Sequence, residues 1–250
     1  MKKIDTVKLL PSFEKLITVR AMKSLVLRPE AEEVVKRVKE GKNLFVFIGS
    51  SGAGRDTVME ECLNRFKNGV RLKRTTTRKP RETIEEKDKQ RMIFTLEKSF
   101  LEDFKKGDIL FAGRYKANQK LYGISKKEIL KIKDKGKSFF LEENFSGLPL
   151  KILLPNSKLI IVLPPTLDDL KDRLFSRDKN DKECEERFKI SVLEIKAFLK
   201  NSEKLVEEGL LDMIVVNGGL PERVGERLNK AIIKKRRFID DYQRVKESFE

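Results

Sequence analysis

The chain has 250 residues, of which 39% are hydrophobic, enough for one substantial α/β domain with additions but a tight fit for two compact domains. Its 56 Lys and Arg residues exceed its 40 Asp and Glu residues, the formal net charge is +16, and it has no histidine. The lack of histidine excludes Ser-His-Asp catalysis and histidine-based metal or acid–base chemistry, whereas phosphoryl transfer needs no histidine.

The cysteines and the first residues bear on cellular location. Cys62 and Cys184 lie far apart and in no paired motif, so we expect neither a disulfide framework nor a zinc site, and a reducing cytoplasm fits. After Lys2 and Lys3 the apolar stretches are short and broken by charges, so we expect no signal peptide and no membrane span. The basic residues are spread along the chain without an aromatic-and-basic cluster, so we do not expect nucleic acid as a partner.

An N-terminal helical extension is expected over residues 1–42. Pro29 suits the first turn of a helix, and Gly41 provides a stop after a run of valines at helical spacing. We therefore treat this segment as an addition to the main domain, which is expected over 43–235.

Strand-like apolar runs recur along that domain. They cover residues 44–48, 109–112, 138–142, 158–163 and 212–216. Helical patterns separate these runs, and such alternation is typical of a parallel sheet covered by helices on both faces. The fold class is therefore α/β, and the polar, charge-rich stretch 71–95 indicates an inserted lobe.

The C-terminal half is predicted to be largely helical. A helix over 166–177 and a long helix from about 182 to 209 flank a charged turn that can close over a ligand. From Glu222 onward apolar residues repeat at helical spacing, so residues 236–250 are expected to be a helical tail.

A phosphate-binding loop in which two residues depart from the usual motif directly follows the run at 44–48. In such loops, backbone N–H groups hold phosphates at the positive end of the next helix. Arg55 stands where lysine is usual and can grip a phosphate through its planar fork, although the two residues are not interchangeable at a tight site. Asp56 replaces a hydroxyl residue and can ligate magnesium or, without metal, repel phosphates. The ATP-binding candidates of the loop are Gly49, Ser50, Ser51, Gly52, Ala53, Gly54, Arg55, Asp56 and Thr57.

Further motifs follow in a fixed order. They are Thr76-Thr77-Arg78-Lys79-Pro80-Arg81, Tyr122-Gly123, Leu163-Pro164-Pro165-Thr166 and Val215-Val216-Asn217. With the loop, they make the chain over 43–235 resemble the guanylate kinase family as a divergent member. The resemblance implies a P-loop three-layer sandwich with a parallel sheet, a small acceptor-binding lobe over about 71–125 and a helical lid over about 173–188.

The same resemblance assigns roles to individual residues. ATP sits on the loop in that family, with Mg²⁺ near Asp56 or Thr57, and Asn217 matches a residue near the adenine. An acceptor phosphate would be held by two arginines and a tyrosine, a clamp suited to a dianion. These acceptor-binding residues are Arg78, Arg81 and Tyr122. The arginines expected to act on the transferred group with Arg55 are Arg173, Arg177 and Arg187.

Each of these assignments has a plainer alternative. Any of the arginines can be a solvent-facing charge in so basic a chain, and Tyr122 can be a packed residue of the lobe. The base-reading positions also depart from the family pattern, because Gly113 replaces a glutamate, Asn144 replaces an aspartate and Met92 replaces an aromatic residue. Glu142 and Asn144 remain candidates for acceptor binding there, and guanine discrimination is weakened.

Three hypotheses therefore stay open. The leading one is an ATP-dependent kinase acting on a small phosphorylated acceptor, GMP first. The second is a ribose 1,5-bisphosphate phosphokinase, a family with aspartate at the place of Asp56 and a segment similar to Tyr115-Lys116-Ala117-Asn118. The third is a non-catalytic guanylate kinase-like binding module with an altered loop. A monomer or a homodimer is compatible with each.

Overall fold

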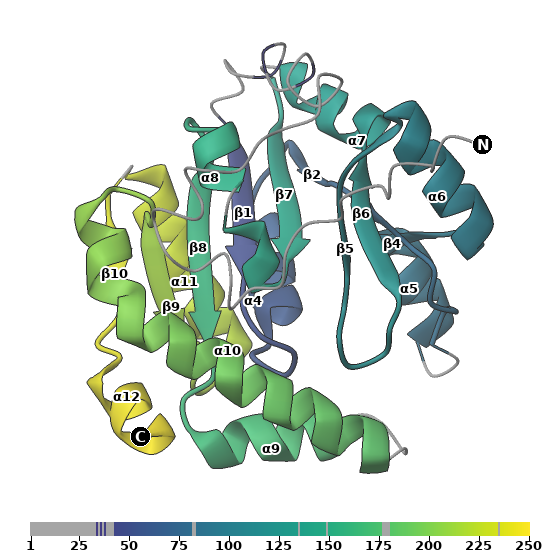
Figure 1. Ribbon diagram of the computed structural model, residues 1–250. Helices are drawn as coiled ribbons and strands as arrows, with labels where there is room; N and C mark the ends of the chain where they lie inside the picture. The colour runs from purple at the N-terminus through teal and green to yellow at the C-terminus, as the bar shows by residue number, and fades with distance from the viewer. Residues whose placement is uncertain are drawn as a thin grey trace.

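The core of the molecule is a six-stranded parallel sheet with strand order β10-β9-β8-β1-β7-β2 (Figure 1). The computed structural model describes residues 34, 36, 38, 43–81, 84–134, 136–148, 150–176, 181–234 and 236–250. The strands of the sheet are β1 (Leu44–Ile48), β2 (Gly69–Arg71), β7 (Ser138–Glu143), β8 (Lys158–Leu163), β9 (Met213–Val216) and β10 (Phe238–Ile239). Its central strands are apolar on both faces, as a sheet covered on both sides requires.

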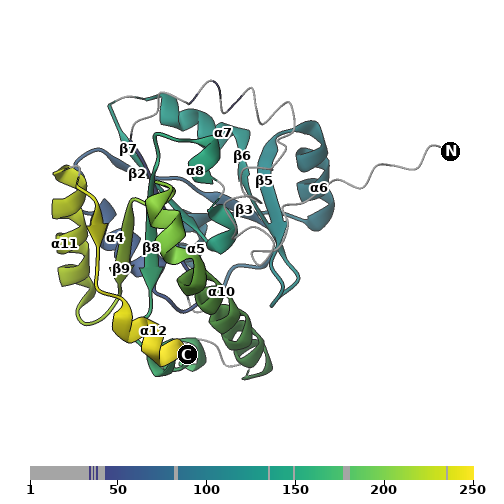
Figure 2. The same cartoon turned by 60° about the vertical axis from the view of Figure 1, so that its left-hand side comes forward.

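Helices cover both faces of this sheet and form two separate apolar clusters. On one face α4 (Arg55–Leu63) and α11 (Pro221–Ile233) contribute Met59 and Leu228 to one cluster. On the other face lie α8 (Leu150–Leu153), α9 (Leu167–Phe175), α10 (Asp181–Glu207) and α12 (Gln243–Phe249). Figure 2 shows α11 and α10 on opposite sides of the sheet. The result is a three-layer α/β sandwich.

A second, smaller sheet forms a lobe beside the main one. Its strand order is β4-β3-β6-β5, with β3–β4 parallel and the other pairs antiparallel. Helix α6 packs Phe100 and Phe104 against Ile109 and Leu121 of this sheet, which gives the lobe a small core of its own. The lobe elements are β3 (Arg74–Thr76), α5 (Glu85–Arg91), β4 (Met92–Phe94), α6 (Glu97–Lys106), β5 (Ile109–Arg114), β6 (Leu121–Ser125) and α7 (Lys126–Leu130), and short 3₁₀ turns follow at Lys131–Lys133 and Phe145–Gly147.

Two sequence-based expectations about elements were wrong. The run 109–112 was counted among the strands of the parallel sheet, but it belongs to the lobe, as the expected lobe bounds of about 71–125 imply, and there β5 pairs antiparallel with β6 and packs on α6. The expected helical tail is interrupted by β10, because Phe238 pairs with Met213 and adds a strand to the sheet edge before α12 begins. A two-residue strand leaves no periodic signal, so the helical spacing hid it.

The remaining element predictions agree closely with the structure. Strands β1 and β8 have the expected bounds, and β7 and β9 differ from theirs by one residue at an end. Helix α9 begins after Thr166, whose hydroxyl accepts a hydrogen bond from the Asp169 N–H. Of the extension expected over 1–42, residues 1–33, 35, 37 and 39–42 lie outside the described part of the chain, and Val34 and Val38 are buried in the main core.

Phe140 of β7 tests how strongly this core is packed. Its side chain is fully buried, and its ring centroid lies 5.2 Å from that of Phe45 and 5.1 Å from that of Phe66. We expect Phe140→Ala to lower the free energy of unfolding by about 3–5 kcal/mol, measured by urea denaturation. Leu96→Ala is the control, since Leu96 is 77% exposed and should change stability by no more than about 0.5 kcal/mol. Equal losses in the two variants would contradict the packing described above.

Candidate functional site

The loop between β1 and α4 has the backbone shape of an anion-binding turn. Gly52 and Gly54 adopt φ of 83° and 80°, a left-handed conformation that glycine tolerates best. No side chain caps the first turn of α4, so its N–H groups point toward the space above the loop. A Cβ at Gly49 would lie 2.6 Å from the Val162 carbonyl oxygen, so the loop passes tightly over β8.

Two of the expected nucleotide-contacting residues brace this loop. The Asn217 side chain donates a 2.9 Å hydrogen bond to the Ala53 carbonyl, and Arg173 Nη2 donates to the Asn217 carbonyl at 2.8 Å. Asn217 follows β9 and Arg173 lies on α9, so the end of the sheet and a helix of the far layer together hold the loop in position. Both side chains also line the cavity described below.

Arg55 is turned back into the protein. Its Nε donates to Glu142 Oε1 at 3.1 Å, and its Nη1 donates to the Gly49 carbonyl. Burial alone would raise the pKa of Glu142, but the charges of Arg55 and Arg74 outweigh burial and hold it well below its ordinary value. The residue that replaces the usual loop lysine is thus paired with a carboxylate at the end of β7.

Asp56 connects the start of α4 to the lobe. Arg71 donates to its Oδ1 at 2.9 Å, and Arg91, at the end of α5, contacts its Oδ2. Arg91 also binds Glu60 one turn further along α4, at 2.9 Å. Burial first, and then the charge of Glu142, raise the pKa of Asp56 to about 6. Neither arginine partner was identified from the sequence.

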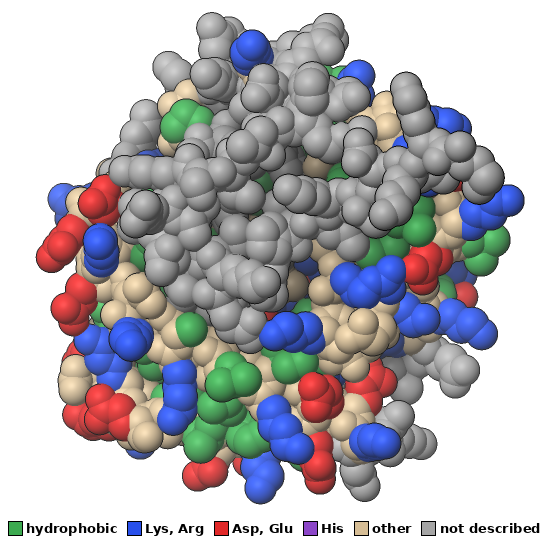
Figure 3. Space-filling view, viewed as in Figure 1, with side chains coloured by type: hydrophobic (Ala, Val, Ile, Leu, Met, Phe, Trp, Pro, Cys, Tyr) green, Lys and Arg blue, Asp and Glu red, His purple; other side chains and the backbone are tan. Residues whose placement is uncertain are grey.

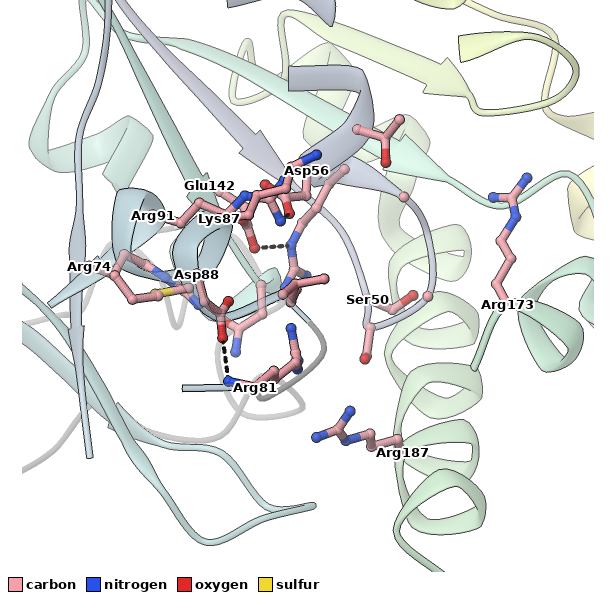
Figure 4. Close-up of a pocket in the computed structure, with 18 of the residues that line it drawn as sticks. Ser50, Asp56, Arg74, Arg81, Lys87, Asp88, Arg91, Glu142, Arg173 and Arg187 are labelled. Carbon is pink, nitrogen blue, oxygen red and sulfur yellow. Dashed lines mark hydrogen bonds and ion pairs between the residues drawn. The ribbon is translucent and has the colours of Figure 1, made fainter. Parts of the chain in front are cut away.

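Arg78 and Arg81, the arginines expected to bind an acceptor phosphate, both contact a buried carboxylate from α5. Arg78 holds Asp88 in a fork, with distances of 2.6 and 2.9 Å, and the Arg81 backbone N–H donates to the same carboxylate at 2.9 Å. Asp88 is only 1% exposed, and burial alone would raise its pKa, but the hydrogen bond from Arg78 holds that pKa below its ordinary value. Figure 4 shows Asp88 beside the Arg81 backbone N–H, and the Arg81 side chain lies in the cavity.

Tyr122 lies beside this group on β6. The Asn118 side chain donates to its hydroxyl at 3.1 Å, and the Arg74 guanidinium lies 5.2 Å from the centre of its ring. Arg74 is nearly buried and pairs with Glu143 at 2.7 Å. Tyr122 is therefore held by polar and cation–π contacts of the lobe.

One cavity of about 510 Å³ brings these groups together, between the loop, the lobe and helix α10, the first residues of which fall in the expected lid. The expected site residues that line it are Ser50, Ser51, Gly52, Gly54, Arg55, Asp56, Thr57, Arg78, Arg81, Tyr122, Glu142, Asn144, Arg173, Arg187 and Asn217. Gly49 and Ala53 lie behind the loop surface, and Arg177 falls outside the described residues. Arg187 is 7% exposed on α10 and pairs with Glu183.

The sequence reasoning missed several cavity residues. Arg74, Lys87, Asp88 and Arg91 all line the cavity, yet they lie in stretches so rich in charge that no single position stands out.

Oxygen donors for Mg²⁺ are present but few. The Asp56 carboxylate and the Thr57 hydroxyl line the cavity, while the described part of the chain holds no group of three or more acidic or cysteine side chains able to bind a metal alone. Mg²⁺ in nucleotide sites takes one or two protein oxygens and completes its shell with phosphates and water. The donor set fits a metal that arrives with a nucleotide, provided that the Asp56 carboxylate releases Arg71 or Arg91, which hold its two oxygens in this structure.

The surface gives two further observations. On the face shown in Figure 3, the described Lys and Arg side chains are interspersed with Asp and Glu rather than gathered in one patch. Among the described residues, no helix combines the length and the apolar character needed to cross a membrane.

Comparison with known proteins gives consistent matches. A sequence model of the family described as guanylate kinase matches residues 41–235. The guanylate kinase of Clostridioides difficile (strain 630) is 35% identical over 161 residues, covering 64% of this chain and 76% of that protein. That of Thermotoga maritima is 31% identical over 183 residues, covering 72% and 82%. The crystal structure of guanylate kinase from Anaplasma phagocytophilum has a TM-score of 0.57 at 22% identity, covers 78% of this chain and 86% of that one, and shares the fold.

Proposed function

Because this chain belongs to the guanylate kinase family, we propose that it is an ATP-dependent kinase that moves the γ-phosphoryl group of ATP to a small phosphorylated acceptor, with GMP as the first candidate. The observation that carries the proposal is the shared cavity. The glycine loop at the start of α4 and the acceptor-side arginines open into the same space of about 510 Å³. Donor and acceptor phosphates can therefore meet there.

On the donor side, the N–H groups of the loop and of the first turn of α4 would hold the β and γ phosphates. Arg55 would add its charge when its guanidinium turns from Glu142 toward the phosphates. Mg²⁺ bound with the nucleotide neutralises phosphate charge, and Asp56 and Thr57 are the residues that would hold it. Asn217 and Arg173 keep the loop in shape, and Asn217 is also proposed to lie near the adenine.

On the acceptor side, Arg78 and Arg81 would bind the acceptor phosphate, and Tyr122 would donate a hydrogen bond to it. An oxygen of that phosphate is the nucleophile, so no protein base is needed. Asp88 fixes the plane of the Arg78 fork before the acceptor arrives. Glu142 and Asn144 are proposed to contact the rest of the acceptor.

Arg187 would act from α10 on the charge that develops during transfer, together with Arg173 and Arg177. Its guanidinium points across the cavity toward Arg81 in Figure 4, so α10 and the lobe present positive charge to the same space. This arrangement supports stabilisation of a phosphoryl group between the two substrates.

Two observations favour the alternatives. The base-reading side of the cavity carries Asn144 where guanine would need a carboxylate partner, which favours an acceptor without a guanine base, such as ribose 1,5-bisphosphate. The pairing of Arg55 with Glu142 and with the Gly49 carbonyl favours a binding module without catalysis, because this loop cation is already engaged.

An acceptor panel tests the proposal. ADP release from ATP and Mg²⁺ is measured with GMP, dGMP, AMP, CMP, UMP and ribose 1,5-bisphosphate, for the native chain and for Arg55→Lys. We expect turnover with a single acceptor class. GMP-dependent release would support a guanylate kinase, and release with ribose 1,5-bisphosphate alone would replace GMP as the acceptor.

Inactive outcomes are also informative. Activity only in Arg55→Lys would mean that the native loop binds nucleotide without supporting transfer. Inactivity of both proteins, together with ADP binding in calorimetry, would contradict the kinase proposal and support the binding module.

A further inference from the structure

Tyr115 occupies a fixed position at the tip of the lobe hairpin. Its backbone N–H donates to the Lys120 carbonyl and its carbonyl accepts from Gln119, both at 2.9 Å. Its ring lies edge-to-face against Tyr122, with centroids 6.4 Å apart and an interplanar angle of 89°. Backbone and ring are therefore held, and the direction of the hydroxyl follows from them.

The hydroxyl of Tyr115 is buried and lacks a hydrogen-bond partner among the described residues. Buried polar atoms of side chains are nearly always paired, so an unpaired hydroxyl beside a cavity indicates a missing partner. The Tyr115 ring lines the same cavity as the loop and the acceptor arginines. Burial raises the pKa of this hydroxyl above its ordinary value, so it is a neutral O–H donor at physiological pH.

The charges around this hydroxyl come from two other elements of the site. Arg55 of the loop and Arg187 of α10 line the same cavity as Tyr115, and the Glu194 carboxylate of α10 acts on the hydroxyl more strongly than either arginine. The hydroxyl therefore lies where lobe, loop and α10 face one another. A phosphoryl oxygen held in this cavity by Arg55 and Arg187 would be an acceptor for the O–H of Tyr115.

We propose that Tyr115 is a further substrate contact of this site, donating its hydroxyl proton as a hydrogen bond to an oxygen of the transferred phosphoryl group. This proposal rests on the kinase function proposed above. Tyr115 exchanges no proton and forms no bond; it holds the phosphoryl group from the lobe side while the loop and α10 hold it from the others. An ordinary packing role would require the ring alone.

The variant Tyr115→Phe separates these roles, because it keeps the ring and its contact with Tyr122 and removes only the hydroxyl. We expect kcat for the best acceptor of the panel to fall by about 10- to 100-fold, as for the loss of a hydrogen bond to a charged group, while KM for ATP stays within about twofold. The matched control is Tyr242→Phe, whose hydroxyl contacts Ser202 at 3.1 Å between α10 and α12. This control should keep native kcat.

A second measurement does not depend on turnover. The chain has three tyrosines, so the NMR spectrum of protein carrying isotope-labelled tyrosine reports their environments without interference from nucleotide bases, which absorb in the same ultraviolet range as tyrosine. ADP, Mg²⁺, aluminium fluoride and GMP supply a stand-in for the transferred group. We expect these to shift the tyrosine spectrum of the native chain and of Tyr242→Phe, and the shift to be mostly lost in Tyr115→Phe.

The two measurements separate failure of this inference from failure of the kinase proposal. If no acceptor supports turnover, the kinase proposal fails and the spectrum alone decides whether Tyr115 meets the phosphoryl mimic. A native kcat in Tyr115→Phe would overturn the inference. So would an unchanged spectral shift in Tyr115→Phe, or no shift in the native chain.

Discussion

Replacing Arg78 with alanine is expected to lower kcat/KM for the acceptor by about 100- to 10,000-fold while leaving the affinity for ATP nearly unchanged. Arg78 would supply two charge-assisted hydrogen bonds to the acceptor phosphate, each contributing about 1.5–3 kcal/mol. ATP affinity should be spared because the glycine loop and its braces, Asn217 and Arg173, do not contact Arg78 in the structure. Steady-state kinetics with varied acceptor and calorimetry with ADP check the two halves of this expectation.

The variant has a second effect that must be separated from the first. Arg78→Ala leaves Asp88, 1% exposed, without the fork that neutralises it, and breaking such a buried pair costs about 3–5 kcal/mol of stability. Arg78→Ala combined with Asp88→Ala removes both charges, so we expect it to recover most of the stability but none of the acceptor use. Recovery of acceptor use in the double variant would show that Arg78 acts only on folding.

Arg244→Ala is the control for an effect of net charge alone. Arg244 is an exposed arginine on α12, far along the chain from the lobe, and its loss reduces the net charge of the protein as much as loss of Arg78 does. It should leave acceptor kinetics unchanged. Equal effects of the two substitutions would mean that the cavity attracts the acceptor by general charge, and the proposed clamp would then be wrong.

The second large effect is expected from Gly54→Ala. Gly54 has φ of 80°, and a Cβ there would overlap the Asn217 side-chain amide, which holds the Ala53 carbonyl. The left-handed conformation costs an L-residue about 1–2 kcal/mol, and relieving the overlap must move the loop or Asn217. We expect ADP affinity to fall at least about 30-fold in calorimetry, since a shift of this size misaligns the N–H groups that face the phosphates.

Gly209→Ala provides the matched control for backbone strain. Gly209 has φ of 68° after α10, but a Cβ there would meet no atom within 4 Å. This variant should lose about 1–2 kcal/mol of stability and keep native ADP affinity. If both glycine variants bound ADP as the native chain does, the loop would not be the nucleotide site.

The sequence predicted the strands of the sheet centre because burial on both faces leaves a continuous apolar run, as in β1 and β8. It could not predict β2 or β10, whose two or three residues gain their conformation from a neighbouring strand. Motifs likewise led to Arg78, Arg81 and the loop, and both arginines and most of the loop residues line one cavity. Their roles in binding remain predictions.

The ion-pair partners of the site residues could not be predicted from the sequence for a different reason. Arg55 meets Glu142 across 87 positions, and Asp56 meets Arg91 in a stretch where most neighbours are also charged. In a chain with 56 basic and 40 acidic residues, the spacing of residues along the sequence does not determine which carboxylate pairs with which arginine. Only the packing of β7, α4 and α5 determines which charges meet.

The bridge from Asp56 and Glu60 to Arg91 has a thermodynamic consequence for the order in which substrates bind. It ties the first two turns of α4, where ATP phosphates would rest, to the end of α5, which carries Asp88 and through it the Arg78 fork. A displacement of α5 on acceptor binding would therefore change the position of the nucleotide loop or the strength of these ion pairs. Linkage makes such an effect reciprocal, so whatever factor the acceptor adds to ATP affinity, ATP must add to acceptor affinity.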